Sequence, residues 1–173
     1  MTRRPPVNGL LPFDRIVDEH GPTVLRVCRS IVGPDDADDA WSDTFLAALR
    51  AYPDLAHPAD VRAWLITIAH RRSIDILRRR ARSPVPHADV PEPATGTDDP
   101  RDEERGPAWD ALASLSERQR QIVVYHHVAG LPYREIAVIV GGSEAAARRA
   151  GADGIAALRR ILTDALQPPE PSQ

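Results

Sequence analysis

Arginine side chains crowd the segment 60–82, DVRAWLITIAHRRSIDILRRRAR, at a spacing that could neutralise phosphate groups. Only Asp75 offsets them in the second half of the segment. So many guanidinium groups beside one carboxylate would gain from nucleic-acid phosphates through charge neutralisation and counterion release. The alternative is a solvated helix end, where cations favour the negative pole of the helix dipole. The cations in question are Arg71, Arg72, Arg78, Arg79, Arg80 and Arg82.

Catalytic groups at a usable spacing are not apparent in the sequence. His126 and His127 are adjacent, so on a helix they point about 100° apart and make a poor metal pair. Gly141-Gly142 lacks the Lys-Ser/Thr pair of a phosphate-cradling loop, and paired carboxylates occur only in acidic runs that we expect to be exposed. We therefore predict that the protein is not an enzyme and has no catalytic residue, metal site or cofactor.

The composition favours a helical protein with local rather than overall basic character. The chain has 173 residues and a formal net charge of −3, so any contact with nucleic acid must come from clustered arginines. The single Cys28 cannot form an intrachain disulfide, which favours a reducing compartment. The first residues lack an apolar signal region, and no run approaches the length of a membrane span. We expect a cytoplasmic protein without membrane insertion.

Apolar periodicity predicts a first helical unit over residues 13–82. Asp14 is a candidate cap for its first helix, and Gly21-Pro22 predicts a kink or a junction between two helices. An acidic second helix follows, then a proline-containing loop over 52–60, and Asp60 is a candidate cap for the arginine-rich helix. The apolar stripe of that helix is formed by Val61, Trp64, Leu65, Ile68 and Ile76.

The segment 83–107 is rich in proline and acids and poor in apolar residues, which predicts a flexible linker. Residues 1–12 and 167–173 are predicted to be disordered tails on the same compositional grounds. The chain is therefore expected to form two small all-α domains joined by this linker.

A second helical unit is predicted over residues 108–166. Ser116 and Gln119 have the spacing of a capping box, and Ser143 is a good cap for the last helix. A short helix over 133–140, a turn at Gly141-Gly142 and the capped last helix are typical of a helix-turn-helix, whose second helix enters a DNA groove. An ordinary pair of antiparallel helices in a bundle is the alternative.

Two independent motif sets resemble the sigma factors of bacterial RNA polymerase, and more narrowly their small extracytoplasmic-function (ECF) subgroup. The first set is DADDAWSDTFLAAL followed by VRAWLITIAHRRSIDILRRR; the second is LASLSERQRQIVVYHHVAGLPYREIAVIVGGSEAAARR. The resemblance spans residues 13–162. It implies two conserved domains that bind core RNA polymerase, recognise promoter DNA and assist strand opening, while RNA synthesis belongs to the polymerase.

The resemblance also implies roles for individual residues. The acidic helix would dock on the clamp helices of the polymerase β′ subunit through Asp38, Asp39, Ser42 and Asp43. The arginine-rich helix and the loop before it, which in the family captures a flipped base, would engage the promoter element nearest the start site through Tyr52, Trp64, His70, Arg71, Asp75, Arg78, Arg79 and Arg80. The last helix would read the upstream promoter element through Ser143, Glu144, Arg148 and Arg149.

Departures from the family pattern lie mostly in the last helix. Small residues stand where family members usually carry larger ones, at Ala147, Ala150 and Gly151, and Asp153 replaces a basic residue. Glycine inside a helix costs about 1 kcal/mol relative to alanine. Alanine at both Gly151 and Gly154 is therefore expected to raise helicity and stability. In the arginine-rich helix, Arg71 stands where the family often has Asn.

Two other functions compete with a complete sigma factor. One is a sigma-like regulator that binds polymerase but reads the upstream element weakly. The other is a helical interaction module whose arginines pair with an acidic protein. An anti-sigma protein that holds the two domains in an inactive state is a further candidate partner.

Overall fold

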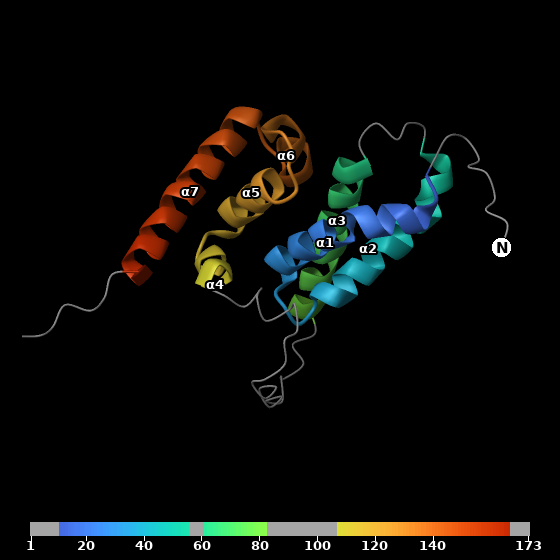
Figure 1. Cartoon of the computed structure of the whole chain (residues 1–173), viewed down its shortest axis with the longest axis horizontal. Coiled ribbons are helices and arrows are strands. Elements are labelled where there is room, and N and C mark those ends of the chain that lie inside the picture. Colours follow the sequence, from blue (N-terminus) through green and yellow to red (C-terminus); the bar gives the residue numbers. More distant parts are fainter. Residues whose placement is uncertain (1–10, 56–60, 83–106, 167–173) are drawn as a thin grey trace, which may run out of the picture.

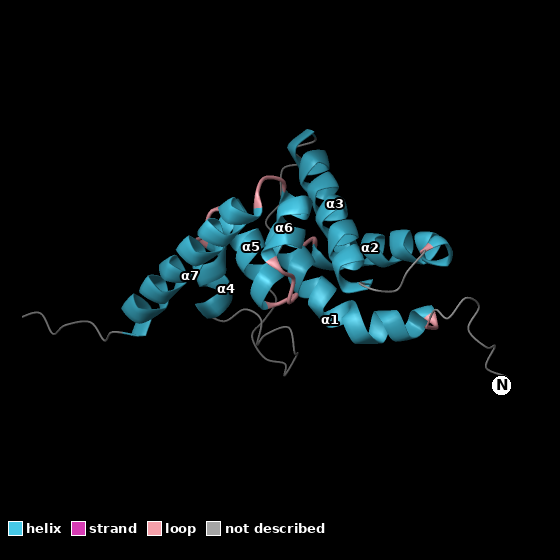
Figure 2. Cartoon of the chain, turned by 90° about the horizontal axis from the view of Figure 1, so that it is seen from above, coloured by secondary structure: helices cyan, strands magenta, loops and turns pink. Residues whose placement is uncertain are grey.

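The computed structural model describes residues 11–55, 61–82 and 107–166, and these residues are helical, with no strand among them (Figures 1 and 2). The predicted tails, the predicted linker and the Asp60 cap lie wholly or almost wholly outside the described residues. The helices are α1 (Phe13–Val32), α2 (Ala37–Ala51), the 3-10 turn η2 (Tyr52–Asp54), α3 (Val61–Arg82), α4 (Pro107–Ala113), α5 (Glu117–His127), α6 (Tyr133–Val140) and α7 (Glu144–Leu166).

Helices α1, α2 and α3 each pack against the other two and form what we call the N-terminal unit (Figure 1). Its core is aliphatic along most of its length, with Val24, Val27, Leu65 and Ile66 almost completely buried. The Phe13 ring meets the ring of Tyr52 edge-on, with 5.3 Å between their centroids. Burial of these apolar stripes is the main stabilising term, and it fixes α2 beside α3.

Helix α1 runs through Pro22 without a break, so of the two predicted alternatives, a kink or a junction at Gly21-Pro22, the junction between two helices is wrong. Gly21 is buried against Trp41, whose indole Nε1 donates a hydrogen bond to the Gly21 carbonyl oxygen at 3.0 Å. Proline inside a helix costs about 3 kcal/mol, and packing of α1 along both neighbouring helices offsets that cost. The helix also begins two residues earlier than a cap at Asp14 would place it, because Pro12 is its cap residue and Asp14 lies in its first turn.

Helices α4 to α7 form what we call the C-terminal unit, in which α5 packs against both α6 and α7. Both predicted serine caps are confirmed. The Ser116 hydroxyl accepts from the Gln119 backbone N–H at 3.4 Å, and the Ser143 hydroxyl accepts from the Ala146 backbone N–H at 3.2 Å. Each cap satisfies one of the free donors in the first turn of its helix.

The turn between α6 and α7 depends on glycine. Gly141 and Gly142 have φ angles of 78° and 105°, a region that side chains with a Cβ atom rarely adopt. The Arg118 guanidinium donates to the Gly141 carbonyl oxygen at 2.8 Å and ties this turn to α5. The predicted helix-turn-helix is therefore present as α6, the glycine turn and α7.

Gly151 and Gly154 do not interrupt α7, which is continuous from Glu144 to Leu166. Both glycines are buried against the rest of the C-terminal unit. A Cβ atom on Gly154 would lie 2.8 Å from Cγ2 of Val123, and one on Gly151 would lie 3.0 Å from Cε1 of Tyr133. These contacts argue against the expectation that alanine at both positions stabilises the protein, because the two glycines allow α7 to approach α5 and α6 closely.

The two units are in contact with each other in this structure. Helix α1 packs against α5, and α3 packs against α6, which lies beside it in Figure 2. Buried residues of both units belong to one continuous apolar cluster. We call the boundary between the units the seam.

Candidate nucleic-acid interface

The second half of α3 presents its arginines to solvent. Three of them also meet carboxylates: Arg78 lies 3.7 Å from Asp75 on the same helix, Arg79 lies 3.7 Å from Asp43 on α2, and Arg80 lies 2.6 Å from Asp36 before α2. Exposed ion pairs of this kind are worth about 0–1 kcal/mol. The arginines can therefore exchange these partners for the phosphates of a nucleic acid.

A hollow of about 340 Å³ lies between Asp43 of the acidic helix and the second half of the arginine-rich helix. Asp43 contributes to its wall from α2, and the rest of the wall comes from α3. The excess of guanidinium groups makes this hollow suitable for an anionic group. Its α3 lining consists of Arg72, Asp75, Arg78, Arg79 and Arg82.

The exposed face of α2 combines acidic and apolar side chains. Asp38, Asp39 and Ser42 are exposed, and Asp43 is half-buried beside Arg79. One helical turn further, Leu46 and Leu49 are 54% and 49% exposed. These two leucines are not among the residues predicted from the sequence. Their spacing from Ser42 places them on the same helical face, which is the signal that could have identified them.

The aromatic residues before and at the start of α3 have unequal access to solvent. Tyr52 is buried, and its hydroxyl donates to the Leu11 carbonyl oxygen at 2.8 Å. Trp64 is half-buried and contributes to the wall of a second hollow of about 470 Å³ that also includes Arg71 and Arg72. Of these two aromatic residues only Trp64 is partly accessible to solvent, and the buried Tyr52 ring lies beside it at 6.3 Å between ring centroids.

His70 differs from the other predicted residues of α3 because it takes part in the seam. Its Nδ1 atom lies 2.9 Å from the hydroxyl oxygen of Tyr125 on α5. Burial lowers the pKa of His70 below its ordinary 6.5, and the Glu117 carboxylate raises it in part. The imidazole is therefore neutral at pH 7 and forms a hydrogen bond rather than an ion pair with the C-terminal unit.

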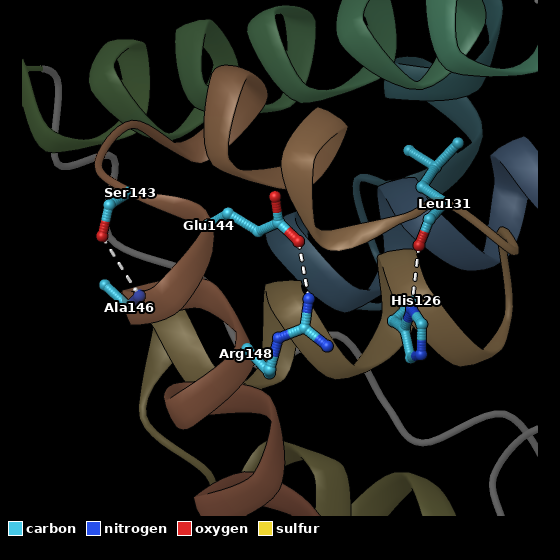
Figure 3. A network of polar contacts seen from close by, with 6 residues as sticks. All are labelled: His126, Leu131, Ser143, Glu144, Ala146 and Arg148. Atoms are coloured by element: carbon cyan, nitrogen blue, oxygen red, sulfur yellow. Dashed lines mark hydrogen bonds and ion pairs between the residues drawn. The ribbon is translucent and has the colours of Figure 1, made fainter.

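The start of α7 leaves its predicted DNA-reading side chains accessible. Ser143, Glu144, Arg148 and Arg149 are all exposed. The Arg148 guanidinium bonds to the Glu144 carboxylate at 2.6 Å, as Figure 3 shows, and lies over the Tyr133 ring at 5.3 Å from its centroid. This arrangement holds the planar head of Arg148 at the exposed start of the helix.

His126, near the end of α5, takes part in the packing of the C-terminal unit, whereas His127 is exposed. The His126 Nδ1 atom lies 2.8 Å from the Leu131 carbonyl oxygen (Figure 3), and the His126 ring stacks on Tyr133 with 4.1 Å between centroids. Within the described ranges no group of three or more His, Cys, Asp or Glu residues could hold a metal ion. None of the described helices is long and apolar enough to cross a membrane.

Three buried groups at or near the seam predict a stability maximum between about pH 6.5 and 9. Because the pKa of His70 is lowered in the folded state, the unfolded chain binds a proton there more readily. The contribution of His70 to stability is therefore fully present above about pH 6.5 and is lost as the pH falls through the lowered pKa. Burial raises the pKa of Cys28 from its ordinary 9.0 to about 11, against the opposing effect of the Ser73 and Thr44 hydroxyls. Stability from Cys28 is therefore complete below pH 9 and is lost between pH 9 and 11.

The alkaline loss from Cys28 corresponds to roughly 2 kcal/mol at pH 11. Burial also raises the pKa of Tyr125, so this tyrosine adds to the loss above pH 10. Urea unfolding followed by circular dichroism at a series of pH values measures the profile. The variant Cys28→Ala should show a shallower alkaline decline, and an unchanged slope would exclude Cys28 as a cause.

Comparisons with known proteins agree with the division into two units. The family described as Sigma-70 region 2 matches residues 16–83, and the family described as Sigma-70, region 4 matches residues 105–158. RNA polymerase sigma factor CnrH of Cupriavidus metallidurans is 30% identical over 143 residues, which cover 75% of each chain. ECF RNA polymerase sigma factor SigK of Mycobacterium sp. (strain JLS) is 27% identical over 163 residues, which cover 87% of this chain and 80% of SigK. This chain belongs to the ECF sigma factors.

The fold of this sigma factor also resembles a solved structure, that of CnrH in complex with the cytosolic domain of CnrY. The two superpose with a TM-score of 0.65 at 26% identity and cover 90% of this chain and 89% of the other. The chain is thus a promoter-directing factor that binds RNA polymerase, and sigma factors as a family are transcription initiation factors. Region 2 corresponds to the N-terminal unit and region 4 to the C-terminal unit.

Proposed function

We propose that this sigma factor divides its work among three surfaces. The exposed face of α2 docks on core RNA polymerase, the arginine-rich half of α3 holds the promoter element nearest the start site, and the first turns of α7 read the upstream element. The observation that supports this proposal best is the adjacency of the first two surfaces. Asp43 and Arg79 pair across them, so polymerase and DNA would be held side by side on one rigid unit.

On α2, docking would use both kinds of exposed side chain. Asp38, Asp39 and Ser42 supply charge and hydrogen bonding, and Leu46 and Leu49 supply apolar area beside them. An interface with an apolar centre and a polar rim is typical of specific protein complexes. The two leucines extend the docking surface by one helical turn beyond the acidic residues.

On α3, the arginines would contact phosphates and Trp64 would stack on an unpaired base beside Arg71. Tyr52 would act through Trp64 and not by direct contact, because its ring and hydroxyl are buried. On α7, Arg148 and Arg149 have the side chain that most often reads guanine in the major groove. Ser143 and Glu144 would contribute contacts at the start of the same helix.

Transcription by core polymerase tests this function directly. Purified protein is combined with bacterial core RNA polymerase and sheared chromosomal DNA of the same bacterium, and the 5′ ends of new transcripts are mapped. The expected result is a set of defined start sites that appear only when the protein is present. Core binding without defined start sites would favour a sigma-like regulator, and absence of core binding would exclude both.

A protein partner that restrains this sigma factor also follows by analogy. CnrH has been solved in complex with the cytosolic domain of CnrY. We infer that the present chain has a partner protein of the same kind and that it works in the cytoplasm, where RNA polymerase acts.

A further inference from the structure

The seam between the two units is built like a protein core and not like a chance contact. Tyr125 and Val124 on α5 are completely buried, as is Cys28 on α1. Cys28 and Tyr125 belong to the same buried apolar cluster, which spans the seam. Burial to this degree excludes water from the contact and stabilises it through apolar area.

Two hydrogen bonds give the seam a defined geometry. The Tyr125 hydroxyl pairs with Nδ1 of His70 at 2.9 Å. The Arg120 Nε–H donates to the Ser30 carbonyl oxygen at 2.8 Å, while its Nη1 donates to the Ala113 carbonyl oxygen at 3.1 Å. Arg120 therefore joins the end of α1 to the turn between α4 and α5.

A cation–π contact adds a further link at the same end of the seam. The Arg29 guanidinium of α1 lies over the Trp109 ring of α4, 5.3 Å from the centroid. Beside this contact, a hollow of about 460 Å³ has walls from both units, including Ile31 and Leu112. The polar contacts at the centre and at the end of the seam fix how the two units are placed, because each contact forms in only one relative placement of the units.

The seam hides one residue that the proposed function needs. His70 lies on the promoter-binding helix but is bonded to Tyr125, whereas Arg71 and Arg72 beside it are exposed. As long as the seam is closed, the His70 edge of α3 faces the C-terminal unit. His70 itself is only partly buried, so the C-terminal unit covers part of this edge, and DNA would reach all of it only after the units separate.

We propose that the free protein restrains itself through this seam, with His70–Tyr125 and Arg120–Ser30 as a latch that must open before α3 engages promoter DNA. The inhibitory part of this proposal rests on the proposed function, since it takes α3 as a DNA-binding helix. The structural part, that the latch holds the two units together, is independent of the proposed function. A protein whose competent state is a minor population binds its target more weakly in proportion to that population.

Cys28, the only cysteine of the chain, belongs to the buried cluster shared by both units, and the Thr44 and Ser73 hydroxyls of its own unit also lie against it. Cys28 is completely buried and its pKa is raised to about 11, so the closed protein should react slowly with a thiol reagent at pH 7.5. The radius of gyration from X-ray scattering is the primary measure of opening, and labelling of Cys28, followed by mass spectrometry, is the second. Circular dichroism melts establish that each variant is folded.

The chain offers a matched pair of arginines for this experiment. Arg120→Gln removes the bond across the seam, and Arg118→Gln removes a bond from the same helix to Gly141 within the C-terminal unit. The Arg120→Gln variant should be labelled roughly fivefold faster or more, and the Arg118→Gln variant at the wild-type rate. Tyr125→Phe, which keeps the ring and removes only the bond to His70, should also be labelled faster. Equal labelling and equal radii in all variants would overturn the latch.

Transcription at limiting protein concentration tests the inhibitory part. The Arg120→Gln and Tyr125→Phe variants should give several-fold more transcript than Arg118→Gln, because a larger share of each is open. Faster labelling without more transcript would show that closure is not inhibitory and would overturn that part. If no variant and no wild-type protein transcribes, the proposed function fails, and the labelling result still decides whether the latch exists.

Discussion

Replacement of Gly151 and Gly154 together by alanine will lower the free energy of unfolding by about 1–3 kcal/mol, the range for overpacking a close-packed core. On an exposed helix the same change would stabilise the protein, since alanine is favoured over glycine by about 1 kcal/mol at each position. In this structure, steric contacts of the added Cβ atoms make the same change destabilising. The new Cβ at Gly154 would meet Val123, a stiff β-branched side chain, at 2.8 Å, and the Gln119 backbone lies just beyond.

The two single variants separate the contributions of the two sites. A Cβ at Gly151 would meet the Tyr133 ring at 3.0 Å and Ile122 at 3.2 Å, which a small shift can relieve. Gly154→Ala should therefore destabilise the protein more than Gly151→Ala. Thermal melts by circular dichroism measure both, with Asp153→Ala on the exposed face of α7 as the control. A higher melting temperature for the double variant would mean that α7 moves away from α5 at little cost.

Features of the fold that depend on neighbours in sequence could be predicted. Ser116 and Ser143 cap helices through donors three residues away, and Gly141-Gly142 turns the chain because of the φ angles that glycine allows. Both signals act within a few residues. The helix-turn-helix of the C-terminal unit follows from them and from the apolar periodicity of its helices.

Features that depend on contacts between distant residues could not be predicted in the same way. Pro22 is tolerated because Gly21 packs on Trp41, 20 residues away. Gly154 is required by Val123, which belongs to another helix. Glycine and proline are both unfavourable inside a helix. Only the tertiary contacts show at which positions that cost is compensated.

The candidate site also combines features that could be predicted from the sequence with features that could not. Exposure of the acidic and arginine-rich faces follows from helical periodicity, whereas the pairs Arg79–Asp43 and Arg80–Asp36 join helices that the sequence does not place side by side. The bond between His70 and Tyr125 spans 55 residues and both units. A buried tyrosine hydroxyl needs a partner, and sequence alone does not say which one.

Charge changes on α2 will weaken binding to core RNA polymerase tenfold or more, which corresponds to about 1.4 kcal/mol. The variant combines Asp39→Arg with Asp43→Asn. Asp39 is exposed, so its reversal places a like charge against the basic surface that a polymerase docking site for carboxylates must present. Asp43 is only neutralised, because an arginine there would also repel Arg79 at a distance of 3.7 Å and confuse docking with folding.

The control carries the same charge change on a different helix of the same unit. Asp18→Arg with Glu19→Gln alters two exposed residues of α1 and should leave polymerase affinity unchanged. Affinity is measured by fluorescence anisotropy of the labelled sigma factor at two salt concentrations, since the loss should shrink as salt screens the interaction. Equal weakening by both variants would reflect net charge and not a docking face. Loss confined to the α2 variant would support docking through Asp39 and Asp43, and because Asp43 also pairs with Arg79, docking would then compete with that ion pair.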